Sequence, residues 1–299
     1  MSVPAARVVA QAKVNLALRV GPRRPDGYHE LATIFARIEL ADDVVVRVLR
    51  TGVTVTVRRG GAPDESVGPP ERNLALRAAH AYMSETQWPP GCAIDIEKRI
   101  PVGAGLGGGS ADAAAVLRAL ESLSPSPVGI ARLTRIGASL GADVPFLALG
   151  SPLALGTGRG DVVEALEPLP PRWLALVQPS FSVSTADAYA WLDADRGLGD
   201  AGPLDSDALR MAARDWAALA AMATNDLQEV VVARYPLIER YCEQLRRAGA
   251  RLAMMSGSGS AVFGLYADEP DVAAIERACH ASVTATRVPA RVVAHLLNE

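Results

Sequence analysis

"PVGAGLGGGSADAA", residues 101–114, places five glycines within seven consecutive positions and then continues into alanines. Glycine inside a helix costs about 1 kcal/mol relative to alanine, so such a run needs a reason. It is either a flexible linker or a loop whose backbone N–H groups close around an anion. A strand pattern, "CAIDIEKRI" (92–100), precedes it, and a helix pattern, "SADAAAVLRALESL" (110–123), follows at once. Because regular elements flank the glycines directly, we favour the anion-binding loop.

The anion is predicted to be a phosphate. The start of a helix offers unpaired N–H groups and the positive end of the helix dipole. The loop contains no lysine, which excludes the Gly-x-x-x-x-Gly-Lys-Ser/Thr class of phosphate loop. A dinucleotide fingerprint is also disfavoured, because "SPSPVGIA" (124–131) stands where an acidic ribose partner would follow.

Composition and charge limit the class of protein. The chain has 299 residues, 49% hydrophobic and 21% charged, which is typical of one large or two ordinary globular domains. A net charge of −3 argues against nucleic acid as the main partner. No apolar run is long enough to span a bilayer, so we expect no membrane partner, and the N-terminus does not resemble a signal peptide. Cys92, Cys242 and Cys279 lack metal or disulfide spacing, which predicts reduced thiols and a cytoplasmic location.

Lysine occurs only at Lys13 and Lys98, so 28 of the 30 basic residues are arginine. A mutational drift toward arginine explains the bias without any function. The two positions that keep lysine are therefore mild candidates for sites that need a compact ammonium group.

The first half of the chain alternates strands and helices. A strand is predicted over Val8–Val20, with an apolar face and a second face that carries Lys13 and Asn15; that second face could also be simply exposed. "RRPDGYHEL" (23–31) predicts a turn. "DDVVVRVLRTGVTVTVRR" (42–59) predicts a β-hairpin about its central Thr-Gly. Helices are predicted over residues 72–84 and over 128–141, with Asp143 just beyond the second.

A domain boundary is predicted near the proline-rich "EALEPLPPR" (164–172), which gives domains of residues 1–160 and 161–299. The second domain begins with the strand pattern "WLALVQP" (173–179) and continues with helical patterns to residue 248. "ARLAMMSGSGSAVFGLYAD" (250–268) predicts two strands around a second glycine turn, and a helix over 270–281 and a short strand follow. The pattern as a whole predicts an α+β fold.

These motifs carry a resemblance. "PVGAGLGGGSADAA" resembles the phosphate loop of the galactose, homoserine, mevalonate and phosphomevalonate kinases, and "MSGSGSAVF" (255–263) resembles their C-terminal glycine motif. "AKVNLALRVGPRRPDGYHELATIF" (12–35) and "LGADVPFLALGSPLALGTGRGD" (140–161) are similar to the branch that phosphorylates 4-diphosphocytidyl-2-C-methyl-D-erythritol. The resemblance covers nearly the whole chain, with gaps in loops and in residues 193–235. It departs mildly at Asp161, where the family usually has glutamate, and at Asp112, where asparagine or serine is common.

The resemblance implies a two-domain small-molecule kinase with an N-terminal nucleotide-binding domain and a ferredoxin-like C-terminal domain. It implies that ATP and Mg²⁺ are used to phosphorylate the 2-hydroxyl of the cytidyl substrate, in the methylerythritol phosphate route to isoprenoid precursors. Asp143 would accept the hydroxyl proton, and Lys13 would orient that pair and stabilise the transferring phosphoryl group. The residues alone also allow Asp143 to be an ordinary turn residue at the end of a helix.

The resemblance also implies the binding residues. Tyr28 and Tyr189 would stack on the cytosine, His29 would read its edge with Phe35 nearby, and ordinary helix packing competes for Tyr189. Asn15 and Thr185 would hold the sugar-diphosphate part. Ser110 would ligate Mg²⁺ or would be a plain helix N-cap. The nucleotide would contact Asn73, Lys98, Pro101, Val102, Gly103, Ala104, Gly105, Leu106, Gly107, Gly108, Gly109 and Ser110.

Two alternatives remain open at this point. A sibling kinase of mevalonate-like or homoserine-like alcohols would share the glycine loop, but it gives no reason to combine Tyr28, His29 and Tyr189. A non-catalytic nucleotide-binding protein of the same fold would need neither Lys13 nor Asp143. The sequence allows either a monomer or a homodimer.

Overall fold

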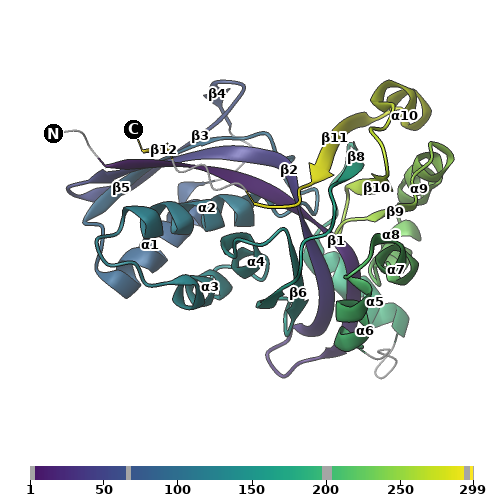
Figure 1. Cartoon of the computed structure of the whole chain (residues 1–299), viewed down its shortest axis with the longest axis horizontal. Coiled ribbons are helices and arrows are strands. Elements are labelled where there is room, and N and C mark those ends of the chain that lie inside the picture. The colour runs from purple at the N-terminus through teal and green to yellow at the C-terminus, as the bar shows by residue number, and fades with distance from the viewer. Residues whose placement is uncertain (1–3, 65–68, 197–203, 293–296, 299) are drawn as a thin grey trace.

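The structure of the chain is a computed structural model that describes residues 4–64, 69–196, 204–292 and 297–298 (Figure 1). An elongated mixed sheet covers a group of helices at one end of the molecule, and a smaller sheet with its own helices forms the other end (Figure 1). This arrangement confirms the α+β fold class. No helix in these ranges is both long and apolar enough to cross a membrane.

The large sheet has eight strands in the order β12-β1-β2-β5-β3-β4, with β6 on β2 and β7 on β6. Its helices α1 to α4 lie together on one side of it (Figure 1). The bounds of these elements are β1 Ala5–Arg23, β2 His29–Leu49, β3 Gly52–Arg59, β4 Ala62–Pro63, a 3₁₀ turn Pro70–Arg72, α1 Leu74–Thr86, β5 Gly91–Glu97, α2 Gly108–Leu123, α3 Ile130–Ala138, α4 Val144–Ala148, β6 Leu153–Thr157, β7 Val162–Ala165 and β12 Leu297–Asn298.

The smaller sheet has the order β11-β8-β10-β9. Its strands and the two helices α9 and α10 follow the β-α-β-β-α-β succession of a ferredoxin-like unit, as expected. The bounds are β8 Arg172–Gln178, α5 Thr185–Arg196, α6 Ser206–Ala212, α7 Trp216–Met222, α8 Gln228–Val232, α9 Leu237–Arg247, β9 Leu252–Met255, β10 Val262–Tyr266, α10 Val272–Cys279 and β11 Ser282–Val288. The boundary predicted between residues 160 and 161 stays a prediction.

The predicted hairpin over residues 42–59 is wrong. β2 and β3 do follow each other in the chain, but β5 lies between them, antiparallel to β2 and parallel to β3. Cys92, Ile94 and Ile96 of β5 are almost fully buried, so β5 suits a central position. The Thr-Gly pair therefore joins two strands that are not neighbours, and local alternation could not reveal the inserted third strand.

The strand predicted over Val8–Val20 is confirmed as part of β1. Its second face is not exposed: Lys13 is 4% exposed and Asn15 is 3% exposed. The pairing of β1 with β2 shifts register between Gln11 and Lys13 and again between Asn15 and Ala17. Such bulges re-aim side chains. Here they coincide with the two polar residues that line the cleft described next.

Candidate active site

A cleft of about 940 Å³ lies where the glycine loop, β1, β2, α5 and the second glycine turn meet. Every residue that the sequence analysis assigned to the reaction, the nucleotide or the substrate lines it. The structure therefore brings the whole predicted set together, while the individual roles remain predictions. The set is Lys13, Asn15, Tyr28, His29, Phe35, Asn73, Lys98, Pro101, Val102, Gly103, Ala104, Gly105, Leu106, Gly107, Gly108, Gly109, Ser110, Asp143, Thr185 and Tyr189.

The glycine loop needs glycine for two physical reasons. Gly103, Gly105 and Gly107 have φ near +70°, the left-handed region that other residues avoid. A Cβ on Gly107 would also come within 3.1 Å of the Lys13 side chain. The loop therefore passes close to Lys13 as well as turning sharply.

The start of α2 is open to an anion. Its N-cap is Gly107, and no side chain caps the first turn. Ser110 is therefore not the N-cap, so that alternative is wrong; Gly108 and Gly109 already belong to the helix. The N–H groups of the first turn have no intrahelical partner, which is the arrangement expected of a phosphate site.

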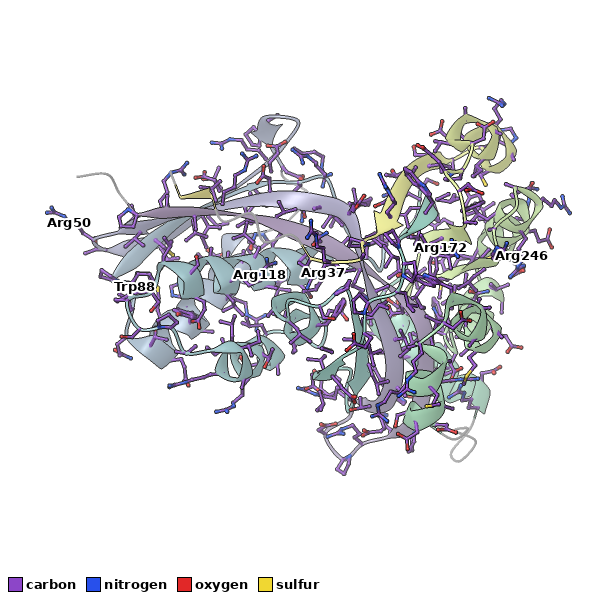
Figure 2. The ribbon with its side chains drawn as sticks, viewed as in Figure 1. Arg37, Arg50, Trp88, Arg118, Arg172 and Arg246 are labelled. Carbon is purple, nitrogen blue, oxygen red and sulfur yellow. The ribbon has the colours of Figure 1, made fainter. Side chains whose placement is uncertain are left out.

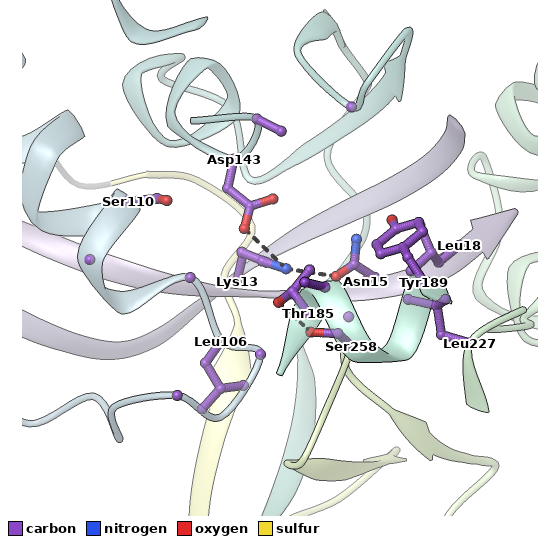
Figure 3. Close-up of a pocket in the computed structure, with 18 of the residues that line it drawn as sticks. Lys13, Asn15, Leu18, Leu106, Ser110, Asp143, Thr185, Tyr189, Leu227 and Ser258 are labelled. Atoms are coloured by element: carbon purple, nitrogen blue, oxygen red, sulfur yellow. Dashed lines mark hydrogen bonds and ion pairs between the residues drawn. The ribbon is translucent and has the colours of Figure 1, made fainter. Parts of the chain in front are cut away.

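Lys13 and Asp143 form an ion pair in the cleft (Figure 3). The Lys13 Nζ atom lies 3.3 Å from Asp143 Oδ2 and donates to Asn15 Oδ1 at 2.8 Å. Asn15 Nδ2 in turn donates to Thr33 Oγ1 at 2.8 Å. The side chain of Lys13 is 5% exposed and that of Asp143 is 28% exposed. The Lys13 ammonium is thus held by Asn15, and the Asp143 carboxylate stays accessible from the cleft.

Asp143 reaches this position because it lies directly before α4. Arg37 of β2 fixes that helix: its guanidinium donates to the carbonyls of Phe146, Leu147 and Leu149. The backbone N–H of Arg37 also donates to Pro152. Arg37 is 1% exposed and lies in the interior of the molecule, whereas Arg50 projects from its tip (Figure 2). Burial, with a contribution from Arg118, lowers the pKa of Arg37 to about 9, so the guanidinium stays charged at neutral pH.

Aromatic residues line the other side of the cleft. Tyr28 is 58% exposed, and the guanidinium of Arg159 lies 5.0 Å from the centre of its ring. His29 stacks on Tyr189, with ring centres 5.2 Å apart and planes inclined by 22°. The His29 Nε2 atom lies 2.7 Å from Asp193 Oδ1. Burial raises the pKa of the Tyr189 hydroxyl, and the negative charge of Asp143 adds to this shift.

Lys98 lies in the cleft wall, and its ammonium forms ion pairs with two buried aspartates. Its ammonium donates to Asp42 and Asp112, and all three side chains are nearly inaccessible to solvent. Burial raises the pKa of Asp112 to about 7; Lys98 opposes this shift and Asp42 reinforces it. The cluster ties the end of β5 to the second turn of α2, on either side of the glycine loop.

Three predicted residues have structural contacts of their own. Asn73 is the N-cap of α1, and its side chain accepts from the N–H of Ala75 at 2.9 Å. Phe35 is 2% exposed and stacks on Phe146 beneath Lys13. Thr185, at the start of α5, shares a 2.8 Å hydrogen bond with Ser258 of the second glycine turn (Figure 3).

Sequence reasoning missed several residues that line the cleft. Thr33, Arg159, Asp193 and Ser258 contact predicted residues directly. Arg159 lies within "GTGRGD" (156–161), part of a motif that carries the family resemblance, so the sequence could have indicated it. Asp193 carried no signal of its own, because it meets His29 only across 164 positions of sequence.

Two family models match the chain. The model of the GHMP kinases N terminal domain matches residues 73–151, and that of the GHMP kinases C terminal domain matches residues 207–284. The 4-diphosphocytidyl-2-C-methyl-D-erythritol kinase of Geobacter metallireducens is 44% identical over 263 residues, 88% of this chain and 89% of that protein. The kinase of the same name from Moorella thermoacetica is 43% identical over 261 residues, which are 87% of this chain and 89% of that protein.

Solved structures have the same fold. A crystal structure of 4-(cytidine 5'-diphospho)-2C-methyl-D-erythritol kinase has a TM-score of 0.75 at 38% identity and covers 94% of this chain and 98% of that one. Homoserine kinase from Cytophaga hutchinsonii also has a TM-score of 0.75, but at 17% identity it shows the fold alone, over 98% and 97% of the two chains. With more than 40% identity to several such relatives over most of its length, the chain belongs to the 4-diphosphocytidyl-2-C-methyl-D-erythritol kinase family of the GHMP kinases.

Proposed function

We propose that this protein transfers the terminal phosphoryl group of ATP to the 2-hydroxyl of 4-diphosphocytidyl-2-C-methyl-D-erythritol, a step in making isoprenoid precursors. The observation that carries the proposal is the single cleft that holds an open helix start, a lysine–aspartate pair and an aromatic wall. The helix start suits phosphates, the ion pair suits proton and phosphoryl transfer, and the aromatic wall suits a base. The family relationship supports the same reaction.

Asp143 is the proposed base. One of its oxygens, Oδ2, faces Lys13, and the carboxylate is accessible from the cleft. Asp143 would accept the proton of the substrate hydroxyl as the oxygen attacks phosphorus. Lys13 would hold the carboxylate in place and offset negative charge on the transferring group. Phosphoryl transfer needs mainly positioning and charge stabilisation, and this pair can supply both.

Magnesium fits the donors that the cleft offers. Mg²⁺ prefers hard oxygen ligands and usually takes only one or two from protein, with phosphates and water completing its shell. Within the described residues no group of three or more acidic, histidine or cysteine side chains is arranged to hold a metal ion, but Ser110 and Asp143 both line the cleft. Ser110 would ligate the ion, which when bound would neutralise charge on the nucleotide phosphates.

The substrate half of the cleft is proposed to clamp cytosine between Tyr28 and Tyr189. Base–aromatic stacking is worth about 1–3 kcal/mol per ring, so alanine at either position should weaken cytidyl binding by about tenfold or more. Phenylalanine should have little effect, because the ring does the stacking. Affinity for an ATP analogue should stay unchanged. Equal losses for both ligands would indicate misfolding and would contradict the clamp.

The direct test is an assay of ADP release with ATP, Mg²⁺ and one alcohol at a time. The cytidyl substrate should be turned over, and mevalonate and homoserine should not. Turnover of either small alcohol at a comparable rate would overturn the substrate assignment. ATP binding with no turnover of any of the three would instead favour a non-catalytic binding protein.

A cytoplasmic location remains part of the proposal. Cys92, Cys242 and Cys279 are all free and buried, which is typical of proteins kept in a reducing compartment.

A further inference from the structure

The His29 side chain is fixed from two directions. Its Nε2 atom lies 2.7 Å from Asp193 Oδ1, and its ring stacks on Tyr189. At a centroid distance of 5.2 Å the two rings are offset, so part of the Tyr189 face is left uncovered beside His29. A base that covers that part would lie next to the imidazole, edge to edge.

The contact with Asp193 decides where the imidazole proton lies. A carboxylate only accepts hydrogen bonds, so Nε2 must carry the proton and donate. In the neutral ring Nδ1 is then a bare acceptor. No described residue bonds Nδ1, and the buried unpaired side-chain atoms of the described residues are Gln11 Oε1 and Asp112 Oδ1 only. Nδ1 is therefore open to solvent, and His29 lines the cleft.

A fixed acceptor distinguishes two pyrimidines. Cytosine carries an amino donor at the ring position where uracil carries a carbonyl acceptor. The amino group can donate to Nδ1, whereas the carbonyl would face another lone pair. A site built around one such hydrogen bond rejects the analogue that lacks it, because its polar atoms are left unpaired.

We propose that Asp193 is a specificity residue: it holds His29 in the Nε2–H form, so that Nδ1 selects a cytidine diphosphate group over a uridine diphosphate group. The inference rests on the proposed function, because it requires the base to lie beside His29. Asp193 acts through His29 and is a positioning residue.

A purely structural role explains the contact less well. The Asp193 side chain is 42% exposed, and an ion pair or hydrogen bond at such a site adds little to stability. His29 is also its sole hydrogen-bond partner within the part of the chain that the structure describes. The contact therefore constrains the imidazole more than it supports the fold.

The test compares Asp193→Asn with Asp195→Asn, an exposed aspartate of the same helix that does not line the cleft. Binding of CDP and of UDP is titrated calorimetrically without ATP. The wild-type protein and the control should prefer CDP by about tenfold or more. The Asp193 variant should lose most of that preference, because an amide can also donate to Nε2 and so shift the proton to Nδ1.

A spectroscopic readout separates proton placement from general damage. Nitrogen-15 spectra of the imidazole rings report which nitrogen carries the proton, and the chain has only four histidines, so a His29 variant identifies the signal. His29 should be Nε2–H in the wild type and mixed in Asp193→Asn, with the melting temperature nearly unchanged. Equal CDP preference and an equal tautomer in all three proteins would overturn the inference alone. A wild type that binds neither CDP nor UDP would overturn the proposed base site as well.

Discussion

At the scale of single residues, the proposed catalytic groups are brought together by contacts that cross the fold. Lys13 comes from β1 and Asp143 from the start of α4, and they meet at 3.3 Å beside the glycine loop. Lys13 also donates its backbone N–H to the Leu106 carbonyl, so the backbone of β1 at Lys13 is tied to the loop.

Asp143→Asn tests the base. The amide cannot accept the hydroxyl proton, so turnover should fall by at least about 100-fold, the usual scale of a lost general base. Binding of an ATP analogue should be unchanged, since the carboxylate is not expected to hold the nucleotide. Steady-state kinetics with an ATP-analogue titration decides this. Turnover close to normal would show that Asp143 is only a turn residue.

Lys13→Met keeps the apolar stem of the side chain but removes the terminal ammonium group and its charge. Turnover should fall by a similar factor, because the phosphoryl group loses the ammonium that offsets its charge. Circular dichroism should stay that of the wild type, since the stem still fills the space beside Gly107. If the variant unfolds and binds no nucleotide, the role of Lys13 is structural.

At the scale of elements, α4 and α2 are each held by a buried charge. Arg37 satisfies backbone carbonyls around the end of α4, three residues or more beyond Asp143. Asp42, Lys98 and Asp112 connect β2, the end of β5 and the second turn of α2. Both anchors lie in the interior, where an unpaired partner would cost the most.

Arg37→Met should destabilise the protein by about 2–4 kcal/mol in denaturant unfolding, because several buried carbonyls lose their donor. Turnover should fall as well, since α4 no longer fixes Asp143. Arg47→Met on the same strand is the matched control: its partly exposed pair with Asp95 is worth at most about 1 kcal/mol. Similar losses for the two variants would contradict the role of Arg37.

Asp112 predicts a pH dependence with a definite sign. Burial raises the pKa of Asp112 from 3.8 to about 7, so the folded state holds the proton more tightly than the unfolded state does. The stability that this proton adds is fully present below the unfolded-state pKa of 3.8 and is lost as pH rises toward 7. Asp112→Asn removes this titration while keeping the shape. The melting temperature of the variant should rise relative to that of the wild type as pH rises from 5 to 8. Parallel curves would contradict it.

At the scale of the whole molecule, the two glycine motifs lie against each other, although residues in contact such as Gly105 and Ser256 are 151 positions apart in sequence. The Ala104 carbonyl accepts from the N–H of Ala261 at 3.1 Å, and the Gly105 carbonyl accepts from Ser256 Oγ at 3.1 Å. A Cβ at Gly105 would overlap the Ser256 carbonyl oxygen. At this point the backbone of the glycine loop and that of the second glycine turn thus lie in close contact.

Gly105→Ala should weaken this contact between the two glycine motifs. The added methyl must displace the second glycine turn, and φ near +75° adds strain, so the melting temperature and the affinity for an ATP analogue should both fall. Gly109→Ala is the control for stability. A Cβ there meets only Leu74 at an ordinary 3.6 Å, and alanine favours the helix. Equal stability of the two variants would contradict a tight contact.

Local signals determined much of this protein. Periodicity, glycine placement and the family resemblance predicted the glycine loop, the turn before Tyr28, strand β1, the two strands around the second glycine turn and the candidate residues. These features depend on backbone conformation within a few residues, and that information is written along the chain. The family resemblance added the proposed roles, which stay predictions; local patterns alone left Asp143 open between a base and a turn residue.

Tertiary structure decided the rest. Four features depend on residues that are far apart in sequence. They are the insertion of β5 between β2 and β3, the burial of Lys13 and Asn15, the cluster around Lys98 and the contact of Asp193 with His29. Alternation fixes which face a strand residue occupies, but it does not state which strand or helix will cover that face. Burial and pairing of charges depend on the covering element, so they are settled only when the whole chain has folded.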